Sequence, residues 1–90
     1  MHYTYKHHAH EPEASQETGD LKKLLIMIEH WIEHENSHAV SYRQWADKAS
    51  VAGEEEIAKE IHLAIDDGVS VRNHLKRAKA ILAAKLASQQ

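Results

Sequence analysis

The chain has 90 residues, enough for one small domain, and no cysteine, which excludes disulfides, thiolate metal sites and cysteine nucleophiles. Its net charge of -3 with histidine neutral argues against nucleic-acid binding, and no apolar run approaches the length that spans a bilayer. We therefore expect a cytoplasmic protein with neither a nucleic-acid nor a membrane partner. The nine histidines are an excess, and histidine both binds borderline metal ions and changes charge near neutral pH.

Residues 1–18 are predicted to be a disordered, histidine-rich tail. They surround the only proline, Pro12, and show no apolar periodicity. Short histidine-rich tracts are typical of metal-binding segments. The tail is therefore expected either to capture metal weakly or only to solubilise the chain, and its histidines are His2, His7, His8 and His10.

Two helices are predicted after the tail, over about 20–50 and 54–87. Asp20 is a good N-cap residue, and apolar residues then recur at three- and four-residue spacing. Gly53 breaks the pattern, and the three carboxylates of residues 54–56 open the second helix, where the helix dipole favours them. The apolar stripe of the second helix is predicted to contain Ile57, Ile61, Ala64, Val71, Leu75, Ala78, Leu82 and Leu86.

No segment shows strand alternation, so the expected fold class is all-α, with residues 19–90 forming an antiparallel helical hairpin. Two helices alone bury little core, so the hairpin is expected to dimerise into a four-helix bundle, a homodimer with two-fold symmetry. Trp31 and Trp45 widen the apolar face on one edge beyond what a two-helix contact uses, which favours the dimer.

The segment HWIEHENSH, residues 30–38, places His30, His34 and His38 in a slanted row beside the core line of the first helix. An antiparallel register brings His74 and either Asp66 or Asp67 to the same edge. Histidines four residues apart can chelate one ion from a single helix face, and a ligand set without thiolate suits Ni(II), Co(II), Zn(II) or Cu(II). The predicted metal ligands are therefore His30, His34, His38, His74 and Asp67.

Glu35 lies near the core line of the first helix. It is either a metal ligand, a buried hydrogen-bonding group, or a sign that the core stripe is slightly rotated. The residues HWIEH also match the inverted zincin pattern H-x-x-E-H, in which two histidines bind zinc and the glutamate is a general base. About seventy ordered residues offer little substrate cleft, so no enzymatic activity is expected.

The segment HWIEHENSHAVSYRQWADKA resembles a family of small, uncharacterised bacterial and archaeal proteins with an H-W-[IV]-x-H-N-x-x-H signature. The resemblance implies a helical hairpin, often with a histidine-rich tail, and implicates His30, His34 and His38, with Trp31 and Trp45 as framework. The chain departs from the signature because Glu35 follows the second histidine and Asn36 comes next, which puts the role of that asparagine in doubt.

The expected function is storage, buffering or delivery of a divalent transition metal, which would imply a metal-delivery partner protein. Metal identity, and whether the site lies within one subunit or between two, stay open. The alternative is a non-enzymatic interaction module whose histidines pack at the dimer interface and loosen it when they are protonated near pH 6.

Overall fold

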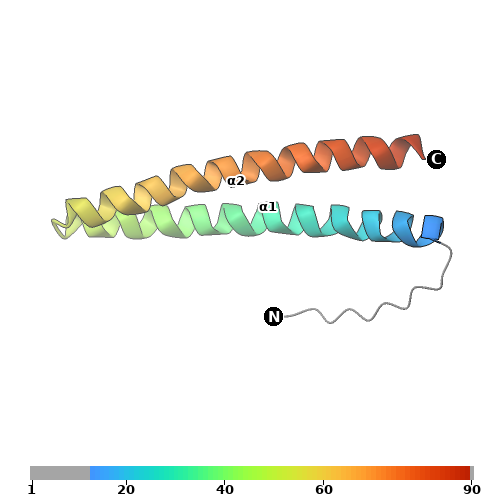
Figure 1. Ribbon diagram of the computed structural model, residues 1–90. Helices are drawn as coiled ribbons and strands as arrows, with labels where there is room; N and C mark the ends of the chain where they lie inside the picture. Colours follow the sequence, from blue (N-terminus) through green and yellow to red (C-terminus); the bar gives the residue numbers. More distant parts are fainter. Residues whose placement is uncertain (1–12, 90) are drawn as a thin grey trace.

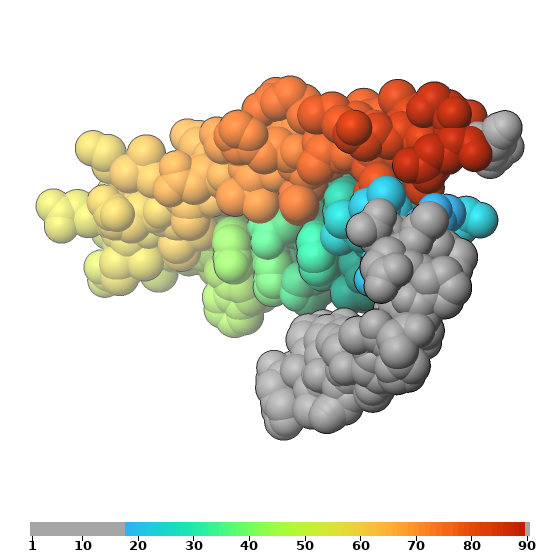
Figure 2. Space-filling model, turned by 45° about the vertical axis from the view of Figure 1, so that its right-hand side comes forward, coloured from blue at the N-terminus to red at the C-terminus, as the bar shows by residue number. Residues whose placement is uncertain are grey.

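The computed structural model describes residues 13–89, which form two helices, α1 (Glu13–Val51) and α2 (Glu55–Ser88). The helices run antiparallel and side by side (Figure 1). The space-filling view shows α2, orange to red, lying against the green and cyan part of α1 (Figure 2). No strand occurs within the described residues, so the all-α hairpin is confirmed.

Helix α1 begins earlier than expected. Its first residue is Glu13, whereas the sequence predicted a start at Asp20, so residues 13–18 belong to the helix rather than to the tail. Glutamate, alanine and glutamine in this stretch are good helix formers, and the chain has a proline only directly before it. The rest of the predicted tail, residues 1–12 with its four histidines, lies outside the described residues.

The turn between the helices has the hydrogen bonds of a Schellman motif. The Gly53 N–H donates to the Ser50 carbonyl at 2.9 Å, and the Glu54 N–H donates to the Ala49 carbonyl at 2.8 Å. Gly53 has a φ of 85°, which glycine adopts without the steric cost of a Cβ. The break expected at this glycine is therefore a compact C-terminal cap that reverses the chain within three residues.

The two helices meet along a seam with a seven-residue repeat, the pattern that lets long helices stay in contact with a slight left-handed twist. The seam is thin, because no large side chain is completely buried among the described residues. Its buried members are Ile28, Ala39, Ala46, Ala58, Ile65 and Leu82. Its half-buried members include Leu25, Ile32, Glu35, Ile61, Gly68, Arg72, Leu75 and Lys79.

The seam of α2 is rotated by one residue from the predicted stripe. Ile61, Leu75 and Leu82 lie in it as expected, but Ile57 is 52% exposed and Val71 is 44% exposed. The seam instead contains the residue that follows each of the predicted positions 57, 64, 71 and 78, namely Ala58, Ile65, Arg72 and Lys79. Arginine and lysine can bury their aliphatic stems while the charged end reaches out, so charged residues occupy a line that the apolar pattern did not mark.

The rotation leaves an uncovered surface on one side of the hairpin, here called the apolar face. His38, Ala64 and Val71 line one hollow, so they lie on the same side of the hairpin. Residues seven positions apart on a helix lie on nearly the same side, so steps of seven residues from these three identify the other residues of the apolar face. On the other side of the seam, Glu29 Oε2 pairs with Lys79 Nζ at 3.3 Å. The apolar face consists of Leu24, Trp31, His38 and Trp45 from α1 and Ile57, Ala64, Val71 and Ala78 from α2.

Candidate metal-binding site

Three histidines form a continuous ladder of rings along α1. The ring centroids of His30 and His34 lie 6.2 Å apart with the rings nearly parallel, and those of His34 and His38 lie 4.4 Å apart with the rings nearly perpendicular. The ring of Tyr42 extends the ladder, 5.6 Å from His38. Successive four-residue steps on one helix produce this stack, so the row predicted from the spacing is present.

The His34–His38 pair has the spacing closest to that of a chelate. With a metal–nitrogen distance of about 2.1 Å, two imidazoles bound to one ion have ring centres roughly 4.5 to 5.3 Å apart. The 4.4 Å separation of His34 and His38 is near this range, while the 6.2 Å separation of His30 and His34 is beyond it. The separation of the His34 and His38 ring centres is therefore compatible with two imidazoles on one ion.

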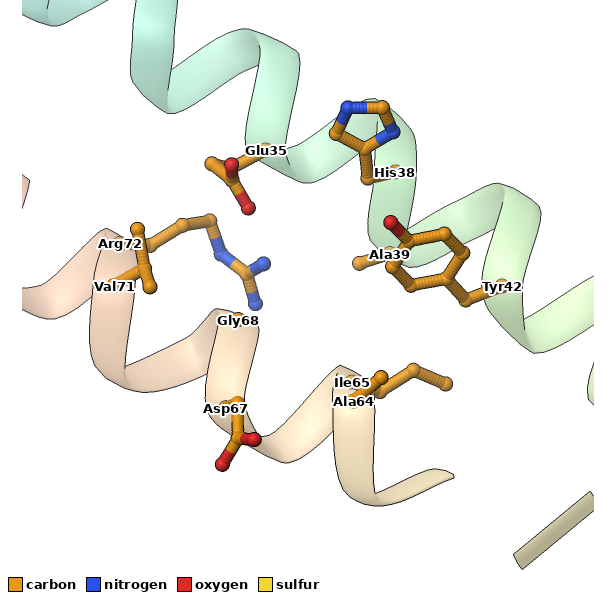
Figure 3. Close-up of a pocket in the computed structure, with 10 residues that line it drawn as sticks. All are labelled: Glu35, His38, Ala39, Tyr42, Ala64, Ile65, Asp67, Gly68, Val71 and Arg72. Carbon is orange, nitrogen blue, oxygen red and sulfur yellow. The ribbon is translucent and has the colours of Figure 1, made fainter. Parts of the chain in front are cut away.

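The other predicted ligands lie on α2. Asp67 lines a hollow of about 250 Å³ together with His38, but the two side chains point away from each other (Figure 3). His74 accepts a hydrogen bond at Nδ1 from Arg77 Nη2 at 3.1 Å, because a guanidinium can only donate. In the part of the chain that the structure describes, no three His, Asp or Glu side chains are placed to hold a metal ion together. The five predicted ligands are thus not assembled in advance.

A charged layer crosses the seam beside the histidine row. Glu35 and Arg72 extend from the two helices into the same space, above Gly68 (Figure 3). A Cβ at position 68 would stand 3.5 Å from Arg72 Nη1 and 3.9 Å from Glu35 Oε1, so the glycine leaves this space to the two polar ends. Glu35 is therefore half-buried on the seam, near Arg72.

Sequence reasoning did not single out Arg72. Its Nη1 atom is buried and has no hydrogen-bond partner among the described residues. A buried donor without a partner costs roughly 1–3 kcal/mol, more when charged, so this atom needs an explanation. The signal that could have found it is position, because residue 72 lies seven residues after Ile65 and seven before Lys79 on the seam of α2.

Neither α1 nor α2 has a stretch apolar and long enough to span a bilayer, within the residues described. A family model described as a domain of unknown function (DUF8180) matches residues 24–82, about two thirds of the chain. The matched segment contains the whole histidine row, the charged layer and the apolar face. No curated protein matches the chain. No solved structure matches it either.

Proposed function

The chain belongs to the DUF8180 family, and we propose that it binds a divalent transition metal ion through the imidazoles of His34 and His38, as a store, buffer or carrier of that metal. The observation that carries the proposal is the 4.4 Å separation of these two rings on adjacent turns of α1. Imidazole ligands without thiolate suit Ni(II), Co(II), Zn(II) or Cu(II). His30, His74 and Asp67 are the further ligands proposed from the sequence.

The unassembled state of the remaining ligands fits reversible binding. Two nitrogens from one helix hold an ion weakly, and each added ligand strengthens the site. Four-ligand zinc sites bind with about 10–16 kcal/mol, so one ligand contributes roughly 3 kcal/mol, or about a hundredfold in affinity. A carrier that gains or loses one ligand can therefore change between holding and releasing its ion, which suits delivery to a partner protein.

Metal titration of matched variants tests the proposal. The starting protein is the full chain with His2, His7, His8 and His10 changed to Ala, so that the tail cannot bind the added ion. Into it we would titrate Ni(II), Co(II), Zn(II) and Cu(II) by calorimetry. Changing His34→Ala and His38→Ala together is expected to weaken the tightest of these interactions by much more than a hundredfold, because two nitrogens are lost and each contributes about a hundredfold.

His62→Ala is the matched control, because His62 is exposed on α2 on the side of the seam away from the apolar face. This control should bind as the starting protein does. Equal affinities in the double variant and the starting protein would refute the His34–His38 site.

The interaction module with interface histidines is the alternative function. The observation that favours it is that His38 lies within the apolar face and lines the hollow with Tyr42. A module of this kind would dissociate on mild acidification whether or not a chelator is present. A metal-binding protein would instead lose its ion on acidification and respond to the chelator at constant pH.

A further inference from the structure

The apolar face combines a projecting side chain with a hollow. Trp31 is 40% exposed, and it lies one heptad before His38, about 10 Å along the same side of α1. The hollow of about 250 Å³ opens between the helices and is lined by small residues, among them Ala39, Ala64 and Gly68. A surface that carries both parts can pair with a copy of itself, because a two-fold contact repeats each interaction twice.

We propose that a second copy of the chain packs antiparallel on the apolar face and inserts its Trp31 indole into this hollow, over the Arg72 guanidinium. Each copy thus supplies the tryptophan that completes the hollow of the other.

The state of Arg72 supports an aromatic occupant. Arg72 is one of the residues that line the hollow, and its guanidinium extends among the other lining side chains (Figure 3). A guanidinium against the face of an indole is among the most favourable cation–π arrangements, so an indole seated in the hollow is stabilised by the part of Arg72 that lines it. The carboxylate of Glu35 also lines the hollow, so an anion is a poorer occupant than a neutral ring.

The position of the hollow selects Trp31 rather than Trp45. The α1 residues that line the hollow are Glu35, His38, Ala39 and Tyr42, so its centre lies near residue 39. If Trp31 of one copy lies opposite residue 39 of the other, the two-fold axis crosses α1 midway between these residues, near residue 35. This position is about the middle of the hairpin, so the two copies overlap along their length. Trp45 would move the axis toward the turn and leave Leu24 and Trp31 uncovered. Its ring also carries the Lys48 ammonium, 4.3 Å from the centroid.

The size of the apolar side of the hairpin is comparable with that of a standard dimer interface. About thirty residues of each helix run side by side, which gives a face about 45 Å long and about 20 Å wide, since a residue rises 1.5 Å and a helix is about 10 Å across. The resulting area, roughly 900 Å², is close to the 800 Å² or so that each partner buries in an interface of standard size. Large apolar side chains are exposed along this length, including Leu24, Trp31, Tyr42, Trp45, Ile57 and Val71.

The axis near residue 35 also passes the level of His34. In the antiparallel pair, α1 of one copy faces α1 of the other, and the two His34–His38 pairs lie on the same side of the bundle, one on either side of the axis. If the chain binds metal as proposed above, the two pairs would share one ion, which gives four imidazole ligands and half an ion per chain. Only this shared ion, and not the dimer, rests on the proposed metal function.

The solution mass of the full chain, measured by sedimentation equilibrium in the presence of EDTA, tests the dimer without involving metal. The wild-type chain is expected to have the mass of two chains at micromolar concentration. Trp31→Ala should weaken dimerisation by about tenfold or more, as a central aromatic anchor does. Ala64→Phe should also weaken dimerisation, because the larger side chain fills the hollow. Residue 64 is exposed in the single hairpin, so the helical circular dichroism of this variant should be unchanged.

Ile26→Ala is the control, because Ile26 is exposed away from the apolar face, and this variant should dimerise as the wild type does. A wild-type chain that is monomeric under these conditions would overturn the proposal. So would Trp31→Ala and Ala64→Phe variants that dimerise with wild-type affinity. Because EDTA removes metal ions, either result would contradict the dimer without contradicting metal binding, which the titration tests separately.

Discussion

The Ile65→Ala variant is expected to lower the free energy of unfolding by about 2–4 kcal/mol. Ile65 is one of the few large apolar side chains that the seam buries, at 6% exposure, and its truncation leaves a cavity between the helices. Small domains are stable by only about 5–15 kcal/mol, so this single change removes a large fraction of the total.

Urea unfolding, followed by circular dichroism, measures the effect of Ile65→Ala. Ile26→Ala removes the same atoms from a side chain that is 64% exposed and should cost well under 1 kcal/mol. If the two variants lost equal stability, the side of α2 that faces α1 would not be the one described.

Zinc is expected to raise the melting temperature of the chain that lacks the four tail histidines. An ion that binds only the folded state adds about 2.7 kcal/mol at one hundred times its Kd. For a domain of this size, 1 kcal/mol corresponds to roughly 4–8 °C, so the midpoint should rise by about 10–20 °C. The gain should disappear when the pH is lowered to about 5, because imidazole must be deprotonated to bind the ion.

The double variant His34→Ala, His38→Ala should show no zinc-dependent rise in melting temperature. Calorimetric scans of the starting protein, the double variant and His62→Ala, each with and without zinc, make the comparison. A rise of the same size in the double variant would place the ion elsewhere on the chain.

Helix periodicity in the sequence was sufficient to predict the hairpin. It placed Ile28, Ala39 and Ala46 on the seam of α1, and it placed the break at Gly53, where the cap forms. The predicted start of α1 was wrong because Asp20 is a strong N-cap residue by type, while Glu13, Ala14, Gln16 and Glu17 before it are good helix formers. Helix propensity and capping preference alone do not decide between two possible first residues of a helix.

The rotation of α2 was missed for a different reason. Ile57, Ala64, Val71 and Ala78 form as regular an apolar line as the true seam, which contains Arg72 and Lys79. Periodicity detects an apolar line but does not say whether it faces the neighbouring helix or lies open on the apolar face. Arginine and lysine can lie on the seam because their aliphatic stems pack against the other helix, and the pattern of apolar residues in one sequence does not show this.

The histidine row could be predicted from spacing, because residues four apart on a helix are neighbours. The particular ring separations could not, since they depend on side-chain rotamers. Contact between the row and α2 ligands also depends on rotamers, and the hydrogen bond from Arg77 shows that His74 has a competing partner. Spacing therefore predicted which residues share an edge, but not which of them touch.

Imidazole NMR spectra of the full chain without tail histidines, recorded near pH 7.5 while Zn(II) is added, test the central claim most directly. The account predicts that the ring signals of His34 and His38 shift together and stop shifting at a fixed ratio of no more than one ion per chain, while those of His62 stay unchanged. The claim would be contradicted by ring signals of His34 and His38 that do not respond to zinc, or that respond no more than those of His62.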